Sequence, residues 1–300
     1  MKKTKIDKTS KMPPLRGVAV TIGTFDGVHK GHAALIKRLK SFGLETVVVV
    51  LEKPFKPVDG LLTSTTEKLN ILSSMGVDKI FIIPPDSEIF NMTATAFLKD
   101  FLIKNLCASH IVIGHDFAFG KNKTGTYKWL AAQAETLNLQ IDLVKAVKAN
   151  KETVSSSGIR SALKASNLKK ASALLGRNYG FCGTAQKGRG VGAKIGFPTI
   201  NIKPESNKIL PTGVFAATVK IKDVLYPAAL SIGRRLTFNV GQAIVPEAHI
   251  LGTKLVVKKD TKIEVELLKK IRSEKKFPSV KALVSAIQKD VARASKFFNL

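Results

Sequence analysis

Two different patterns of apolar residues divide the chain. Between residue 17 and about residue 145, short continuous apolar runs alternate with segments whose apolar residues recur every three or four positions. The continuous runs predict buried strands, and the spaced segments predict amphipathic helices. The predicted strands are 18–22, 46–51, 79–84, 110–114 and 140–144, and the predicted helices are 30–41, 65–75, 95–106 and 127–137. Strands joined by helices favour a Rossmann-like, doubly wound parallel sheet, whose ligands bind at the carboxyl ends of the strands.

After about residue 175 the pattern changes to short strands separated by glycine and proline. Such a run predicts antiparallel pairing, here a small closed barrel. The predicted strands are 181–186, 197–202, 213–221, 226–232, 246–251, 254–258 and 262–268. The last segment, 280–298, predicts a helix with an apolar stripe that packs on the barrel. The stripe comprises Val280, Leu283, Val284, Ile287, Val291 and Ala294, whereas Lys289 and Asp290 lie off it.

A hydrophobic content of 44% is typical of a globular protein. A length of 300 residues is enough for one large domain or two of ordinary size. Residues 1–16 are basic and contain no apolar segment, so we expect a loose tail there. No run reaches the length of a membrane span, and we expect no membrane association. Cys107 and Cys182 are the only cysteines, which excludes a disulfide framework and favours a reducing cytoplasm.

Lysine and arginine outnumber aspartate and glutamate by 49 to 22, which gives a formal net charge of +27. Such an excess attracts polyanions. The basic residues are spread along the chain, only 7% of residues are aromatic, and RNA-binding signatures are missing. We therefore expect no specific nucleic-acid binding, although weak, salt-sensitive binding is expected at low ionic strength.

The segment GTFDGVHKGH, Gly23 to His32, follows the first predicted strand and precedes the first predicted helix. His29 and His32 therefore lie at or near a helix N-terminus, where backbone N–H groups and the helix dipole favour phosphate. Gly31 between them lets a ligand lie against the backbone. The alternative is that one histidine caps the strand and the other is solvated.

A second candidate phosphate site is VSSSGIR, residues 154–160, which opens another helical run. Ser156 and Ser157 offer hydroxyl caps and Arg160 offers a guanidinium suited to phosphate oxygens, although serine-rich caps are also ordinary helix starts. The chain contains no Walker A sequence.

The third candidate phosphate site is the basic, glycine-rich loop 187–196, which contains Gly188, Gly192, Lys194 and Gly196. It is not a dinucleotide fingerprint, because residues 197–201 predict extended chain where a helix is needed. Its N–H groups can still surround a phosphate.

Polar residues in the predicted barrel strands are further candidates. Thr199 and Asn201 alternate with isoleucines, so they share a face and can ligate Mg²⁺ directly or through water. Glu247 stands in an apolar strand, where it serves either as a general base or as the partner of a lysine. His110, His249 and Trp129 are expected to be core residues.

Taken together, these segments resemble the bacterial bifunctional riboflavin kinase/FMN adenylyltransferase (FAD synthetase) family, from about residue 17 to the end of the chain. The motifs that carry the resemblance are 23–32, 114–121 and 154–160 in the first half, and 174–179, 192–201, 210–216, 247–251 and 271–279 in the second.

The resemblance implies an FMN adenylyltransferase domain at 17–172 and a riboflavin kinase domain at 173–300, after the 1–16 tail. Riboflavin would receive phosphate from ATP in the barrel, and FMN would receive AMP from a second ATP in the first domain. Mg²⁺ would be the cofactor, and riboflavin, FMN, FAD and ATP the partners. Any self-association is expected to be weak.

It also implies roles for individual residues. His29 and His32 would stabilise the α-phosphate, and Ser156, Ser157 and Arg160 would hold the departing pyrophosphate. Glu247 would be the kinase base. The resemblance further places Gly23, Phe25, Asp26 and Gly31 in the ATP site, Gly188, Gly192, Lys194 and Gly196 over the kinase phosphates, Thr199 and Asn201 at Mg²⁺, and Asp116, Phe119 and Arg272 at the flavins.

The chain departs from the family pattern at several places. Ala193 stands where arginine is usual, Ile200 where alanine is usual, and Ser157 where threonine is usual. Residues 51–57 lack the usual histidine, and residues 252–260 replace a usual acidic stretch. These changes bear on flavin contacts and on the kinase more than on adenylyl transfer. Two alternatives stay open: a nucleotidylyltransferase for another phosphorylated acceptor with a barrel that only binds, and a nucleic-acid-binding protein on a nucleotide fold.

Overall fold

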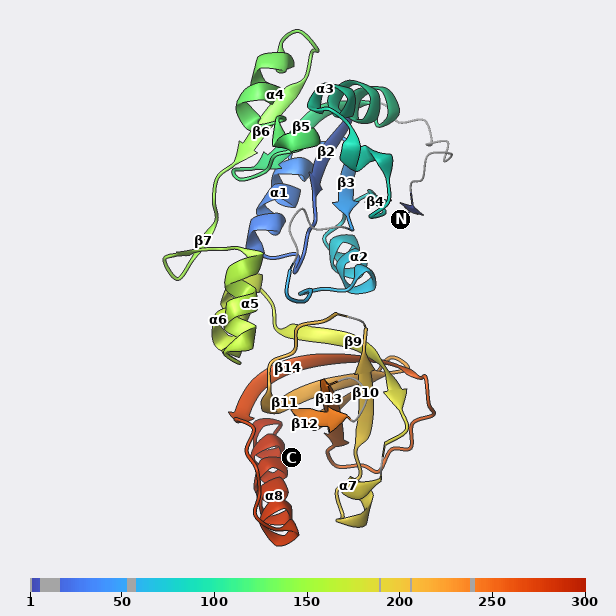
Figure 1. Cartoon of the computed structure of the whole chain (residues 1–300), viewed down its shortest axis with the longest axis vertical. Coiled ribbons are helices and arrows are strands. Elements are labelled where there is room, and N and C mark those ends of the chain that lie inside the picture. The colour runs from blue at the N-terminus through green and yellow to red at the C-terminus, as the bar shows by residue number, and fades with distance from the viewer. Residues whose placement is uncertain (1, 6–16, 53–57, 189, 206, 238–240) are drawn as a thin grey trace. The chain divides into compact units, whose positions relative to one another are not determined.

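The computed structural model describes residues 2–5, 17–52, 58–188, 190–205, 207–237 and 241–300. Its contacts group the chain into two compact units, one made of 1–58 with 65–155 and the other of 59–64 with 156–300 (Figure 1). The domain boundary expected between residues 172 and 173 stays a prediction.

The first unit is a six-stranded, fully parallel sheet with helices between its strands. Its elements are β1 (Lys2–Lys5), β2 (Val18–Gly23), α1 (Lys30–Lys40), β3 (Thr46–Leu51), α2 (Thr65–Ser74), β4 (Lys79–Ile83), η1 (Glu88–Asn91), α3 (Ala94–Ala96), η2 (Phe97–Asn105), β5 (Ala108–Gly114), η3 (Lys121–Lys123), α4 (Tyr127–Ala134), β6 (Gln140–Val144), β7 (Lys148–Ala149) and β8 (Glu152–Thr153). The doubly wound sheet predicted from the sequence is confirmed.

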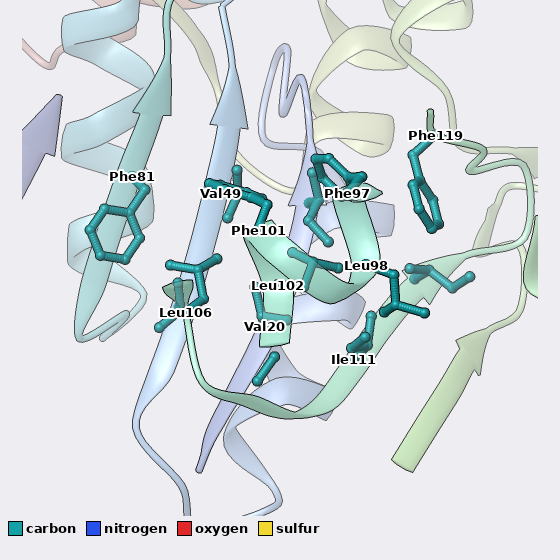
Figure 2. Packing of buried hydrophobic residues seen from close by; sticks show 14 of the residues in the cluster. Val20, Val49, Phe81, Phe97, Leu98, Phe101, Leu102, Leu106, Ile111 and Phe119 are labelled. Atoms are coloured by element: carbon teal, nitrogen blue, oxygen red, sulfur yellow. The ribbon is translucent and has the colours of Figure 1, made fainter. Parts of the chain in front are cut away.

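Both faces of this sheet are buried, which explains why its strands are continuous apolar runs. On one face Val20 and Val49 pack against α3 and η2, including Phe97 and Phe101 (Figure 2). On the other face the alternate strand residues, among them Val48, pack against α1 and α2. Burying apolar side chains contributes roughly 25 cal/mol per Å² of apolar surface, so two such cores hold the sheet firmly.

The strand order is β1-β4-β3-β2-β5-β6, so the winding direction reverses between β2 and β5. Ligands of open parallel sheets bind beyond the carboxyl ends of the strands at such a reversal. The segment Gly23 to His32 leaves the end of β2, and the segment that starts at Gly114 leaves the end of β5. The topology therefore places the start of both motifs at the expected ligand-binding edge.

The second unit is a closed six-stranded antiparallel barrel with helices, as predicted. Its elements are α5 (Ser156–Lys164), α6 (Leu168–Leu175), β9 (Tyr179–Gln186), α7 (Val191–Lys194), β10 (Ile200–Pro204), β11 (Gly213–Ile221), β12 (Val224–Thr237), β13 (Gly241–Ile250), β14 (Lys262–Arg272) and α8 (Val280–Phe297). Helix α8 packs on β11, β12 and β14, which confirms that its stripe faces the barrel (Figure 1).

Four expectations were wrong. Residues 254–258 form no strand and Val256 is 97% exposed, because the closed barrel leaves no free edge for a seventh strand. Lys2–Lys5 are not loose but pair with β4; backbone pairing at a sheet edge needs no apolar side chains, and residues 6–16 lie outside the described part. On α8, Val280 is 66% exposed whereas Asp290 is buried.

Candidate active sites

The loop between β2 and α1 is held in an unusual backbone conformation. Phe25 and Val28 have positive φ angles of 47° and 38°, and Gly27 has a φ of 85°. Non-glycine residues in this region cost about 1–3 kcal/mol each and persist only where their surroundings fix them. Here Phe25 is fully buried and Val28 is 3% exposed, so packing holds the loop.

The two histidines of the motif lie together at the start of α1. His29 is the N-cap, and its Nδ1 accepts the backbone N–H of His32, while Nδ1 of His32 accepts the backbone N–H of His29. Their rings stack with centroids 3.7 Å apart. Because each Nδ1 is an acceptor, a neutral ring carries its proton on Nε2, so the donor of each ring is its Nε2–H group. The predicted position at a helix N-terminus is confirmed, and the two donors belong to one site.

Small and aromatic residues shape this site. A Cβ at Gly31 would lie 3.1 Å from Nδ1 and Cε1 of His29, so a side chain there would displace the ring. A Cβ at Gly23 would touch the Phe25 ring at 3.4 Å, and that ring lies 4.9 Å from the ring of His32. The Phe25 ring therefore packs against His32 and has no surface exposed to solvent.

A buried lysine lies against the same loop. Lys68 of α2 is 5% exposed, and its Nζ donates to the carbonyl of Thr24 at 2.6 Å. Burial lowers the pKa of Lys68, and the nearby charges of Asp26 and Glu52 act in the opposite direction. Asp26 is itself 3% exposed, so buried groups of opposite charge lie near one another at this loop. No sequence motif or apolar pattern singles out Lys68.

Two residues expected at a flavin lie in different environments on the connection after β5. The side chain of Asp116 is 84% exposed. Phe119 is 3% exposed and packs among Phe97, Phe117 and Trp129 in the core of the first unit (Figure 2). Phe119 therefore offers a ligand little surface in this structure, and both flavin roles stay predictions.

The serine-rich motif forms the start of α5 as expected, since the helix begins at Ser156 and continues through Ser157. Nε of Arg160 donates to the carbonyl of Gly60 at 2.9 Å, a contact within the second unit. The role predicted for these residues at a pyrophosphate stays a prediction.

In the second unit a cavity of about 500 Å³ lies on the outer face of the barrel, beside α8 and the glycine-rich loop. Four of the predicted site residues line it together: Gly192, Thr199, Glu247 and Arg272. Apolar side chains of α8, namely Leu283, Ile287 and Val291, form one wall. A cavity of this size with an apolar wall and a few convergent polar groups is typical of a small-molecule site.

Strand register explains how the polar groups converge. Glu247 on β13 is paired with Asn201 on β10 and with Ser231 on β12. Directly paired residues point to the same face of a sheet, so the three side chains form one row. Ser231 lines the cavity with Glu247, and it could not be predicted because an isolated serine in a strand carries no sequence signal.

The glycine-rich loop packs closely on the segment that carries Thr199 and Asn201. A Cβ at Gly188 would lie 2.1 Å from Nδ2 of Asn201, and a Cβ at Gly192 would lie 2.4 Å from the Phe197 carbonyl and 3.2 Å from Oγ1 of Thr199. The loop also contains α7, a single helical turn that the sequence did not predict. Lys194 ends that turn and Gly196 follows it with a φ of 87°.

Arg272 is fixed at the cavity by an ion pair with α8. Its guanidinium contacts the Asp290 carboxylate through three N···O distances of 2.7, 2.9 and 3.0 Å. It also lies over the ring of Phe277, 5.4 Å from the centroid. Both Asp290 and Phe277 line the cavity, and periodicity alone had placed Asp290 off the packed stripe.

His249 is not the core histidine that we expected. It lines the cavity, and its Nδ1 lies 2.9 Å from the Pro198 carbonyl. A carbonyl only accepts, so Nδ1 carries the proton. The Phe197 ring meets the imidazole edge-on at 5.6 Å. His249 therefore braces the segment that leads into Thr199.

The side-chain oxygens of Thr199 and Asn201 are ligands that suit a magnesium ion bound together with a nucleotide. Among the described residues there is no group of three or more histidine, cysteine, aspartate or glutamate side chains able to hold a metal. Thr199 and Asn201 offer neutral oxygen ligands, and Mg²⁺ commonly completes such a shell with water and substrate phosphates. The close approach of Gly192 to Thr199 leaves the loop backbone next to that position.

Within the described chain, no helix combines the length and apolar character needed to span a bilayer. Residues 53–57, where the sequence departs from a family motif, lie outside the described residues.

Comparisons with known proteins match both halves of the chain. Residues 11–158 match the FAD synthetase family model, and residues 175–298 match the riboflavin kinase model. The bifunctional riboflavin kinase/FMN adenylyltransferases of Buchnera aphidicola (strain APS) and Escherichia coli K12 are each 32% identical to the chain, over 94% and 96% of it and 93% and 95% of their own lengths. A crystal structure described as a macrolide-efflux protein from Streptococcus pneumoniae superposes with a TM-score of 0.87 at 27% identity, covering 97% of this chain and 98% of that one. The chain therefore belongs to the bifunctional riboflavin kinase/FMN adenylyltransferase family.

Proposed function

We propose that the chain catalyses two consecutive steps of flavin cofactor synthesis: it phosphorylates riboflavin to FMN and then transfers AMP to FMN to give FAD. The observation that carries the proposal is that both family models match and that each matched segment contains a built site. The paired imidazoles at α1 form one, and the cavity that contains Glu247 forms the other.

In adenylyl transfer an oxygen of the FMN phosphate attacks the α-phosphorus of ATP, and the bond to the β-phosphate breaks to release pyrophosphate. The attacking phosphate is already ionised at neutral pH, so no general base is needed and the catalytic task is alignment and charge stabilisation. The Nε2–H donors of His29 and His32 would stabilise the negative charge that develops on the α-phosphate. Binding of the pyrophosphate is the role that the family resemblance implies for Ser156, Ser157 and Arg160.

In the kinase step the terminal ribityl hydroxyl of riboflavin attacks the γ-phosphorus of ATP, and ADP leaves. This nucleophile is neutral, so a base is useful. Glu247 would take the hydroxyl proton, since its carboxylate lies in the cavity next to an apolar wall that suits a flavin ring. The glycine-rich loop would cover the phosphates.

Mg²⁺ would be held by Thr199 and Asn201 together with the ATP phosphates, and when bound it neutralises phosphate charge. Asn201 would stay oriented by its row with Glu247. Gly192 would keep the loop backbone close enough to donate N–H groups to the phosphates.

The chain's setting follows from the same chemistry. Cys107 and Cys182 are not joined in a disulfide, which suits the reducing cytoplasm where ATP and flavins are available. Specific binding to nucleic acid is not part of the proposal, and weak self-association stays a prediction.

Incubation of purified protein with riboflavin, ATP and Mg²⁺, with the flavins resolved by chromatography, should show FMN first and FAD later. In a second reaction, FMN and ATP should release pyrophosphate. If neither FMN nor FAD forms, the proposal fails. Pyrophosphate release with another phosphorylated acceptor but not with FMN would favour a different nucleotidylyltransferase.

A further inference from the structure

We infer that Lys68 is a positioning residue for adenylyl transfer: from α2 it holds the strained loop between β2 and α1 so that the two imidazoles keep their reactive arrangement. The inference rests on the proposed function of this site and extends it to a residue that contacts the loop rather than the substrate.

The loop is strained, and Lys68 adds a polar contact to the packing that holds it. Phe25, Gly27 and Val28 all have positive φ angles, and only one of the three is glycine. The stored strain favours relaxation to ordinary backbone angles unless neighbouring groups oppose it. The Val28 N–H donates to the Phe25 carbonyl at 3.1 Å, which closes a turn inside the loop.

Lys68 opposes relaxation from outside the loop. Its Nζ donates to the Thr24 carbonyl at 2.6 Å, immediately before the first strained residue. A charged donor makes a shorter and stronger hydrogen bond than a neutral one, and burial strengthens it further. The contact joins positions 44 residues apart, so it ties α2 to the end of β2.

Burying an ammonium group costs free energy. If Lys68 only filled space, an apolar side chain of similar size would stabilise the fold at least as well. Asp26, 3% exposed in the same loop, supplies the nearby negative charge. Asp26 and the Thr24 carbonyl belong to the loop that leads into His29. The hydrogen bond and the charge of Lys68 therefore both stabilise the loop that positions the two imidazoles.

The test compares Lys68→Met and Lys68→Arg with wild type in the full-length chain. Methionine keeps the length but removes the donor and the charge, whereas arginine keeps both. We expect Lys68→Met to lower kcat for FMN adenylylation about 10- to 100-fold, the effect of a small misplacement of catalytic groups. The KM values for ATP and FMN should change less than threefold, because the imidazoles act mainly in the transition state. Lys68→Arg should recover a large part of the lost kcat.

A matched control is available at the other end of α1. Nζ of Lys40 donates to the Met75 carbonyl at 3.1 Å, but this lysine is exposed and does not touch the loop. Lys40→Met removes a similar bond and should leave kcat within twofold of wild type. Riboflavin phosphorylation, measured on the same samples, should be unchanged in all variants.

Wild-type activity with FMN and ATP decides the proposed function before any variant is made. Given that activity, the inference is overturned if Lys68→Met keeps kcat within twofold, or if Lys68→Arg is no better than Lys68→Met. It is also overturned if the loss only follows the unfolded fraction, which the fluorescence of Trp129, the chain's one tryptophan, reports for the first unit.

Discussion

Replacing Asp290 by alanine should destabilise the barrel unit strongly. Asp290 is 4% exposed and lies on α8, and its carboxylate is the partner of Arg272 on β14. Removing it leaves the guanidinium, whose side chain is 19% exposed, without its counter-charge in a largely buried position. Breaking a buried ion pair from one side is far more damaging than replacing the pair by apolar residues.

The magnitude follows from the burial of the two groups. One-sided loss of a fully buried pair costs about 3–5 kcal/mol. Because Arg272 keeps some contact with water, we expect the lower end, about 3 kcal/mol. For a unit of this size that lowers Tm by about 6–12 °C.

Thermal unfolding followed by circular dichroism measures the loss, while Trp129 fluorescence follows the first unit separately. Lys289→Ala is the matched control, because this neighbour on α8 is exposed and should change stability by less than about 0.5 kcal/mol. The double variant Arg272→Met/Asp290→Leu should recover most of the stability, since no buried charge is left unpaired. A Tm within 2 °C of wild type for Asp290→Ala would refute the reasoning about this ion pair.

Three further predictions follow from the two sites and the sheet. Glu247→Gln should reduce riboflavin phosphorylation by about 10²- to 10⁴-fold, the range for loss of a general base, and leave FMN adenylylation intact; equal loss of both steps in the flavin assay would contradict it. His29→Asn keeps a good helix N-cap but removes the imidazole, so FAD formation from FMN should fall at least about 100-fold with little change in Tm, and retained activity would exclude a catalytic role. The hydrogen bond from Thr46 Oγ1 lowers the pKa of Asp78, so its stabilisation is fully present above the ordinary value of 3.8 and is lost as pH falls through the lower folded value. Thr46→Val should therefore cost stability in urea unfolding at pH 7 and cost less near pH 3; an equal cost at both pH values would show that the carboxylate is not involved.

The strands of the first unit were predictable because burial on both faces leaves a continuous apolar run, as in residues 46–51. The start of α1 was predictable for a local reason as well, since turn residues precede a helical stripe. Both features are decided by residues close together in the sequence. The barrel's closure was predictable from the many short strands, but its exact number of strands was not, because an exposed run such as 254–258 has the same composition as a paired one.

The missed residues depend on partners that are distant in the sequence. Periodicity places Asp290 off the apolar stripe of α8, and only its partner Arg272 on β14 explains why it is buried. Lys68 stands beside Glu67 on α2, which looks like an ordinary charged surface in a sequence, but its partner is the carbonyl of Thr24. Hydrophobic periodicity records which side chains avoid water, and it does not record which charged side chains find a buried partner.

Under the proposed function, the chemistry of the two acceptors would account for the difference between the two sites. A phosphate acceptor is ionised before it reacts, so a site for it needs aligned donors and no base, and a strained loop that fixes His29 and His32 meets that need. A hydroxyl acceptor must lose a proton during the reaction, so its site needs a carboxylate in a partly apolar cavity, and Glu247 has that environment. Variants that disturb geometry without altering charge should therefore harm adenylyl transfer first, whereas variants that remove a single proton acceptor should harm phosphorylation alone.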